Sequence, residues 1–276
     1  MIGIIRVAII LGLFLSLVIA LVPFQYLFVK ARLGWQRSLP RLFHRMAAYL
    51  LGFRVKTHGK IATGRPLLLV SNHVSWSDIV VLSSVANVCF IAKSEVRKWP
   101  VFGTFAVLQR TVFVEREKKG RTAQQASDIA MRLAGGDAMV LFPEGTTSDG
   151  NRVLPFKTSL FGAAHAAIRE AGEEKVVVQP VSIAYTGVHG MPMGRYHRPI
   201  ASWPGDVELM PHLKGILKEG AIDVEIRFGE PVIVTADTSR KELARIMEIR
   251  VKTMLQSSLL GREIADETVH LSNHDK

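Results

Sequence analysis

The side chains best suited to chemistry in this 276-residue chain follow a short apolar run at residues 66–70. The run ends in Ser-Asn-His-Val-Ser-Trp-Ser-Asp, which places His73 five residues before Asp78. A carboxylate that accepts a hydrogen bond from an imidazole holds its tautomer and raises its basicity, so this pair has the chemistry of a general base and its orienting acid. A His and an Asp this close in sequence can also form a structural hydrogen bond, or be two unrelated surface groups.

The spacing of the pair also predicts where a helix begins. Two residues five apart on a regular helix point about 140° away from each other. His73 and Asp78 can therefore meet only if His73 lies in the turn before a helix and Asp78 in its first turns. We expect that helix over residues 76–85, after a strand over residues 66–71.

A second polar cluster follows another apolar run, at residues 138–141. Here the chain continues Phe-Pro-Glu-Gly-Thr-Thr-Ser, with Glu144 between Pro143 and Gly145. Two strands that each stop in a polar cluster predict one crevice at the carboxyl edge of a sheet, where ligands of open α/β folds usually bind. The alternative is an ordinary strand-to-loop turn with a solvated Glu.

These residues resemble a known family. Asn72-His73 followed by Asp78, together with the Phe-Pro-Glu-Gly-Thr block, is similar to the lysophosphatidate acyltransferase-like family of glycerolipid acyltransferases. Further segments look like the family's second conserved block, at residues 93–96, 99–103 and 111–116, and its fourth, at residues 178–181. The resemblance runs from about residue 66 to residue 184, in the order of the family's blocks.

The resemblance implies acyl transfer from a thioester to a lipid hydroxyl. In this reading His73 is the base, Asp78 is its orienter, and the second and third blocks bind the acceptor. The expected substrate-binding residues are Arg116, Glu144, Gly145, Thr146, Thr147 and Lys157. Backbone amides at residues 72–75 or at Gly145 are the expected oxyanion donors. The acyl thioester, of acyl carrier protein or coenzyme A, is a co-substrate, and no cofactor is expected.

One departure from the family's pattern bears on the acceptor. Members that bind a phosphate usually have Arg two residues after the Gly of the third block, where this chain has Thr147. Arg is the best bidentate partner of a phosphate. Residues 144–156 look more like the bacterial lyso-ornithine lipid acyltransferases, whose acceptor carries an amino-acid head group that Glu144 would suit. A 1-acylglycerol-3-phosphate remains the alternative acceptor, since Arg116, Arg152 or Lys157 can bind its phosphate.

Apolar residues make up 48% of the chain and concentrate at its start. Residues 7–29 are almost wholly apolar, and about 23 such residues can span a bilayer with some tilt. We expect an uncleaved anchor over residues 1–30 rather than a signal peptide, because no small-residue cleavage site followed by a polar mature start is evident. The anchor either crosses the bilayer or dips in without crossing.

Five cations follow the anchor between residues 30 and 45. By the positive-inside rule they place the rest of the chain in the cytoplasm, at the inner membrane. Residues 31–58 are typical of a basic interfacial helix, although a helix packed on the domain core has the same pattern.

The formal net charge of +11 calls for an anionic partner. The chain has no glycine-rich phosphate loop, no stacking-aromatic platform and no zinc spacing, so anionic membrane lipid is favoured, and neither nucleic acid nor metal is expected. The basic run at residues 116–121 can instead receive acyl carrier protein or coenzyme A. The single cysteine, Cys89, lies in an apolar run and predicts a buried thiol.

Apolar strands and helical segments alternate after the anchor, which predicts an α/β fold, a layered central mixed sheet flanked by helices. We expect an acyltransferase domain over residues 59–260 and a polar tail over 261–276. The predicted strands are residues 66–71, 88–92, 111–115, 138–142, 176–184 and 222–228. The predicted helices are residues 76–85, 122–133, 159–170, 207–217 and 240–259. A non-catalytic lipid-binding protein is the rival from another functional class, against which His73 and Asp78 argue.

Overall fold

A mixed β-sheet with helices on both faces forms the body of the protein in this computed structural model, which describes residues 2–114, 122–170, 172–205 and 207–262. The predicted fold class is therefore confirmed. Across the sheet the strand order is β1 (Phe53–His58), β8 (Ile222–Phe228), β6 (Val176–Val188), β2 (Leu67–Ser71), β5 (Ala138–Leu141), β3 (Cys89–Lys93) and β4 (Val112–Val114). Two further short strands, β7 (Met191–Pro192) and β9 (Val232–Val234), pair with β6.

The strand directions bring two predicted polar clusters to one edge. Strand β2 runs parallel to both of its neighbours, β5 and β6. Strand β3 runs parallel to β5 and β4, whereas β8 is antiparallel to β6. Because β2 and β5 are parallel neighbours, the residues that follow them meet at the carboxyl edge of the sheet.

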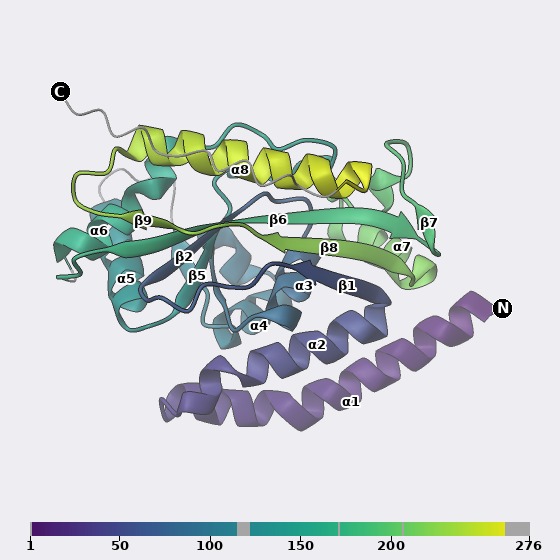
Figure 1. Cartoon of the computed structure of the whole chain (residues 1–276). Coiled ribbons are helices and arrows are strands. Elements are labelled where there is room, and N and C mark those ends of the chain that lie inside the picture. The colour runs from purple at the N-terminus through teal and green to yellow at the C-terminus, as the bar shows by residue number, and fades with distance from the viewer. Residues whose placement is uncertain (1, 115–121, 171, 206, 263–276) are drawn as a thin grey trace.

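Side chains of β2 alternate between two hydrophobic layers. Leu68 and Val70 belong to the layer covered by α5 (Thr122–Ala134), α6 (Gly162–Glu170) and α8 (Arg240–Leu260). Leu67 and Leu69 belong to the layer covered by α2 (Leu39–Leu51), α3 (Ser77–Val85) and α7 (Leu209–Glu219). Figure 1 shows α8 and α2 on opposite sides of the sheet. A strand buried on both faces explains the continuous apolar run before His73.

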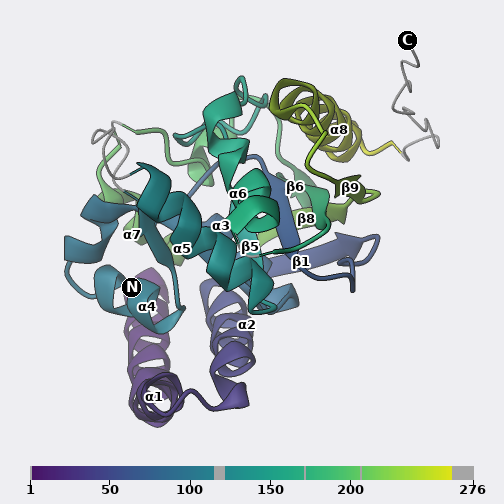
Figure 2. The same cartoon turned by 90° about the vertical axis from the view of Figure 1, so that its left-hand side faces the viewer.

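Helix α1 (Ile2–Lys30) lies beside α2, and its Ile10 packs in the layer that contains Leu67 and Leu69. From Ile5 to Lys30 it is long and apolar enough to cross a membrane, by length and composition alone. Figure 2 shows α1 and α2 together at one side of the molecule. The large apolar side chains of α1 that stay exposed are Ile5, Ile9, Leu11, Leu13, Leu15, Ile19, Phe24, Tyr26 and Leu27.

The segment between the anchor and the first predicted strand differs from the sequence prediction. Residues 31–58 contain a short 3-10 turn η1 (Gly34–Arg37), helix α2 and strand β1. Strand β1 pairs with β8 along its whole length, so the sheet begins at Phe53 and not after residue 58. Sequence reasoning missed β1 because an edge strand buries few side chains, and only Phe53 is buried here.

The remaining predicted elements are present, with ends that shift by a few residues. The predicted strand over 176–184 continues to Val188, and the predicted helix over 159–170 divides into a 3-10 turn (Thr158–Phe161) and α6. Helix α4 (Phe102–Leu108) and a 3-10 turn η2 (Ser94–Lys98) were not predicted. Residues 263–276 of the predicted tail lie outside the described residues.

Candidate active site

His73 and Asp78 meet at the carboxyl end of β2, in the geometry that their spacing predicts. His73 lies in the turn after the strand, and Asp78 lies in the first turn of α3. The distance between His73 Nδ1 and Asp78 Oδ2 is 2.7 Å. When Nδ1 carries the proton that the carboxylate accepts, Nε2 keeps its lone pair, so the ring can act as a base through that atom.

Asp78 is fully buried, and protein donors hold both of its oxygens. Oδ2 accepts the backbone N–H of Val74 at 2.6 Å and of Ser75 at 3.0 Å, besides its contact with His73. Oδ1 accepts the hydroxyl of Tyr185 at 2.8 Å. These bonds fix the plane of the carboxylate and compensate its charge for the loss of water.

Tyr185 comes from β6, and no signal in the sequence connects it with the pair. It is 1% exposed, and its hydroxyl lies 2.6 Å from Ser77 Oγ. Burial, and then the negative charge of Asp78, raise the pKa of Tyr185 well above its ordinary value. The phenol therefore stays protonated over the whole physiological pH range, and its O–H donates a hydrogen bond to Asp78.

The backbone and ring of His73 are held by the cluster that follows β5. The His73 N–H donates to Glu144 Oε1 at 2.8 Å, and the His73 carbonyl accepts the N–H of Ser148 at 2.8 Å. The imidazole stacks on Phe142 with ring centroids 4.1 Å apart. The side chain remains 21% exposed, so a reacting group can reach it.

Glu144 does not have the geometry expected of a head-group ligand. It is 2% exposed, and its second oxygen, Oε2, accepts the N–H of Leu154 at 3.0 Å. Burial raises the pKa of Glu144 to about 8, although the two N–H donors act in the opposite direction. The carboxyl group therefore ties the loop after β5 to the backbone of His73, and the prediction that it contacts the acceptor is not supported by this geometry.

Most of the backbone amides expected to stabilise an oxyanion already donate to protein groups. The prediction named the N–H groups of residues 72–75 and of Gly145. Four of these donate to an acceptor of the protein: His73 to Glu144, Val74 and Ser75 to Asp78, and Gly145 to the Phe142 carbonyl at 3.2 Å. Such a donor can serve an oxyanion only if its present bond breaks.

The other predicted substrate-binding residues lie around the same loop. Gly145 has φ +75°, a left-handed conformation that favours glycine, and this lets the chain turn after Glu144. Thr146 is exposed, whereas the Thr147 hydroxyl donates to the Trp203 carbonyl. Lys157 is exposed, and its N–H donates to the Pro143 carbonyl at 2.9 Å. Arg116 lies outside the described residues.

Asn72 fixes the end of β2 against β6. It is fully buried, its Nδ2 donates to the Ile183 carbonyl at 2.9 Å, and its Oδ1 accepts the Ile183 N–H at 2.9 Å. The side-chain amide thus replaces the backbone pairing at the point where the chain turns away toward His73.

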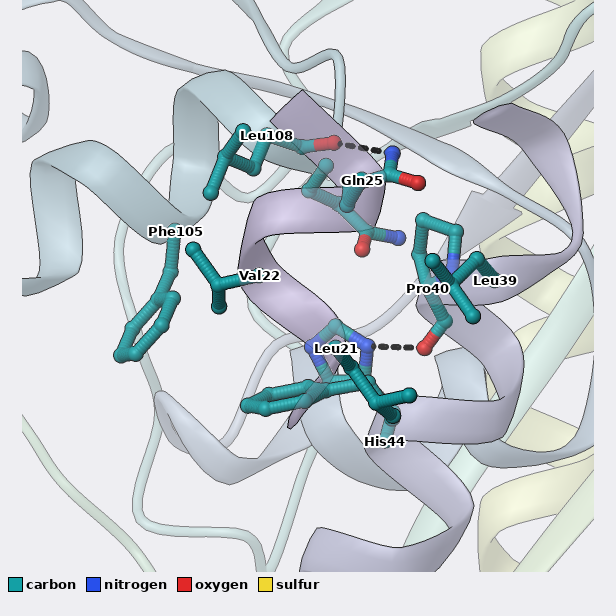
Figure 3. Close-up of a pocket in the computed structure, with 10 residues that line it drawn as sticks. Leu21, Val22, Gln25, Leu39, Pro40, His44, Phe105 and Leu108 are labelled. Carbon is teal, nitrogen blue, oxygen red and sulfur yellow. Dashed lines mark hydrogen bonds between the residues drawn. The ribbon is translucent and has the colours of Figure 1, made fainter. Parts of the chain in front are cut away.

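A separate, apolar pocket lies between α1, α2 and α4 (Figure 3). Two polar side chains in it have partners in the protein. Gln25 Nε2 donates to the Leu108 carbonyl at 2.8 Å, and His44 Nδ1 lies 2.7 Å from the Pro40 carbonyl. Burial lowers the pKa of His44 to about 4, against the effect of this bond, so the ring is neutral at pH 7. The pocket marks where α1 docks on the domain.

Comparison with known proteins places this chain among the acyltransferases. Residues 52–184 match the family described as Acyltransferase. The chain is 71% identical to the lyso-ornithine lipid O-acyltransferase of Brucella abortus, over 96% of this chain and 100% of that protein. It is 55% identical to the lyso-ornithine lipid O-acyltransferase of Rhizobium meliloti, over 95% of this chain and 90% of that protein. The crystal structure of the 1-acyl-sn-glycerophosphate acyltransferase PlsC of Thermotoga maritima has the same fold, with a TM-score of 0.61 at 23% identity, over 95% of this chain and 99% of that one.

Proposed function

We propose the specific reaction of this chain from the premise that it belongs to the acyltransferase family and is an O-acyltransferase. The reaction is transfer of a fatty acyl group from a thioester to the hydroxyl of a lyso-ornithine lipid, which makes ornithine lipid. One observation carries the choice of acceptor, namely 71% identity along nearly the whole chain to a relative that bears the name of this activity.

In this proposal His73 is the catalytic base. Its Nε2 removes the proton of the acceptor hydroxyl while the oxygen attacks the thioester carbonyl. As the carbon–sulfur bond breaks, the imidazolium returns the proton to the departing thiolate, so an ester and a thiol result. Asp78 holds the ring and stabilises the imidazolium, as the third member of a serine-hydrolase triad does. The bond of 2.7 Å between the two side chains supports these roles.

The acceptor head group would lie near the exposed side chains of the loop after β5. Thr146 and Lys157 are exposed there, whereas Thr147 is engaged with Trp203 and stands where phosphate-binding members have Arg. This arrangement favours an amino-acid head group over a phosphate. The alternative substrate, 1-acyl-sn-glycerol 3-phosphate, would depend on Arg116 or Lys157.

The donor would be an acyl thioester of acyl carrier protein or of coenzyme A. Either contains the carbonyl that is attacked and the thiolate that leaves, so the proposed chemistry requires no cofactor and no metal. The basic surface of the chain, with its net charge of +11, suits both an acidic carrier protein and the phosphates of coenzyme A.

The protein would bind the inner membrane from the cytoplasmic side, with α1 lying in the plane of the interface. Near one end of α1, Arg6 donates to the carbonyls of Lys218 and Glu219, both at 3.1 Å. Near the other end, Gln25 donates to the carbonyl of Leu108. These points of α1 are about 28 Å apart along a helix, close to the thickness of the hydrocarbon core. A helix that crossed the bilayer would not hold both contacts with a domain on one side.

The deciding experiment incubates membranes that contain the full-length protein with an acyl thioester and either lyso-ornithine lipid or lysophosphatidate. Mass spectrometry then identifies the diacyl product, and both donors are tried. We expect ornithine lipid. His73→Ala should lower the rate about a thousandfold, since a positioned general base contributes roughly 10²–10⁴.

The matched control is His189→Asn, which changes a half-exposed histidine paired with Glu219 and should leave the rate unchanged. Asn suits the left-handed backbone of that residue, φ +53°. Phosphatidate as the main product would reject the proposed acceptor. Full activity of His73→Ala would reject the proposed base.

A further inference from the structure

A cavity of about 190 Å³ lies at the amino edge of the sheet, away from His73. Its wall includes the first residues of two strands, Ala138 of β5 and Cys89 of β3. Asp137, which precedes β5, also lines it. His73 follows the opposite, carboxyl end of β2, which is the parallel neighbour of β5. The cavity is therefore separate from the candidate active site.

Three guanidinium groups share one buried carboxylate at this cavity. Asp137, whose side chain is 3% exposed, accepts two hydrogen bonds from Arg110, at 3.0 and 2.7 Å. It also accepts a hydrogen bond from Nε of Arg132 at 2.6 Å, and Nε of Arg37 forms an ion pair with it at 3.0 Å. One negative charge thus faces three positive charges, which leaves an excess of two.

Two arginines, Arg37 and Arg65, line the cavity itself. The Nη1 of Arg65 donates to the carbonyls of Ala62 and Gly64. Partial burial, and then the positive charge of Arg37, lower the pKa of Arg65. Arg65 is exposed, and no carboxylate among the described residues pairs with it, so its guanidinium is available to an anion that enters the cavity.

The chemistry of these groups favours a phosphate. Guanidinium groups present paired N–H donors that match the oxygens of a phosphate, and an excess of positive charge in a partly enclosed cavity is stabilised by an anion. The basic groups named here are arginines, which keep their charge at all physiological pH values.

The position of the cavity favours a lipid as the source of that phosphate. Arg37 ends η1, the turn that joins α1 to α2. The same turn region exposes two large apolar side chains, Leu33 at 44% and Trp35 at 67%. With α1 in the membrane interface, these side chains would enter the apolar layer and the cavity would lie at the depth of the phosphates.

We propose that this cavity binds the phosphate of an anionic phospholipid head group, held by Arg37 and Arg65. The site is distinct from the acyl-transfer site, and its occupation would tie the α1–α2 turn, the domain and the lipid together. It neither requires nor affects the choice of acceptor proposed above.

The test measures the thermal unfolding of the full-length protein in an uncharged detergent. Three probes are titrated separately: inorganic phosphate, dihexanoyl phosphatidylglycerol and dihexanoyl phosphatidylcholine, the lipids below their micellar concentrations. We expect phosphatidylglycerol to raise Tm saturably and phosphatidylcholine to have no effect. Arg65→Gln should raise the apparent Kd for phosphatidylglycerol about tenfold or more, as expected for the loss of a charged hydrogen-bond donor.

The control variant is Arg41→Gln, which removes the same charge from an exposed position of α2 that does not line the cavity. It should leave the Kd unchanged. Equal weakening by both variants would show diffuse surface attraction and overturn the proposal, as would the absence of any shift with phosphate and phosphatidylglycerol. Equal stabilisation by inorganic phosphate would keep the phosphate site but reject the lipid as its source.

A second variant keeps the test decisive if Arg65→Gln fails to fold. Arg65→Lys retains the charge and loses the paired donors, so it should bind phosphatidylglycerol more weakly than the unmodified protein and should fold as it does. Unchanged binding by Arg65→Lys would overturn the assignment of Arg65 as a phosphate ligand.

Discussion

At the scale of single residues, the feature that matters most is the fully buried Asp78 and its set of donors. One oxygen accepts His73 and two backbone N–H groups, and the other accepts Tyr185. A buried carboxylate with one donor removed is left partly uncompensated, so each of these bonds influences the basicity of His73.

Tyr185→Phe tests this arrangement. Tyr185 is a positioning residue in our proposal, because its hydroxyl contacts Asp78 and not the substrate. Without this donor the carboxylate should hold the proton of His73 more strongly, so the acid limb of the kcat profile should move to higher pH. We expect kcat to fall about 10–100-fold with KM unchanged. This change in rate corresponds to the free energy of one hydrogen bond to a charged group.

The control for Tyr185→Phe is Tyr49→Phe, which changes a tyrosine that is 83% exposed on α2. Steady-state kinetics across pH provide the measurement. A loss of rate with an unshifted profile would indicate that Tyr185 acts on packing alone.

Glu144 provides a second prediction at this scale, in the pH dependence of stability. Its pKa is about 8 in the folded protein against an ordinary value of 4.5, because burial disfavours the charged form. Between these values the folded state keeps a proton that the unfolded state releases. The stability that Glu144 contributes is thus fully present below about pH 4.5 and is lost as pH rises through about 8.

We therefore expect Tm of the unmodified protein to fall between pH 5 and 8 more steeply than Tm of Glu144→Gln, which cannot ionise. Thermal unfolding at several pH values measures this. Glu230→Gln, at an exposed position, is the control and should keep the slope of the unmodified protein. Parallel curves for Glu144→Gln and the unmodified protein would contradict the prediction.

At the scale of elements, the site depends on how β2, β5 and β6 are joined at their carboxyl ends. Backbone pairing between β2 and β6 runs up to Ser71, and beyond it the side chain of Asn72 makes both bonds to Ile183. The loop after β5 then holds His73 through Glu144 and Ser148. The position of the imidazole is thus set by two neighbouring strands as well as by its own.

Asn72→Ala should destabilise this junction. It leaves the N–H and the carbonyl of Ile183 buried without partners, at about 1–3 kcal/mol for each group, so we expect a loss of about 2–6 kcal/mol and a fall in Tm of several degrees. Ser182→Ala is a matched control on the same strand. Its hydroxyl is buried and has no hydrogen-bond partner within the described part of the chain, so its removal should change stability by less than about 0.5 kcal/mol.

At the scale of the whole molecule, the proposed contact with the membrane depends on how α1 docks on the domain. Its contacts with the domain at Arg6 and at Gln25 favour an anchor that lies in the interface. Helix α2 shares this surface. Its Ala47 and Ala48 are buried against the domain, whereas Leu42, at 48% exposure, faces outward.

This arrangement makes a topological prediction. Fluorescent-protein tags that fold only in the cytoplasm should fluoresce whether they are fused to the first or to the last residue of the chain, because both ends would lie on one side of the membrane. Alkaline phosphatase fused at the same two positions should be inactive. A dark amino-terminal tag with an active phosphatase fusion would show that α1 crosses the bilayer.

The sequence by itself determined the family, the α/β class, the meeting of His73 with Asp78 and the long apolar helix at the start of the chain. The meeting of the two side chains follows from local spacing, because a short buried strand, a turn and the first turn of a helix bring residues five apart together. The likeness to lyso-ornithine lipid acyltransferases was likewise present in residues 144–156 and agrees with the relatives at 71% and 55% identity.

Only the tertiary structure decided what surrounds that pair. Tyr185 is 107 residues from Asp78, and Glu144 contacts the backbone of His73, 71 residues away. No local spacing in the sequence predicts either contact. The same holds for β1, for the contacts of Arg37 and Arg110 with Asp137 and for the two docking points of α1. The direction in which a polar side chain points is set by which strands become neighbours, and that choice depends on packing of the whole sheet.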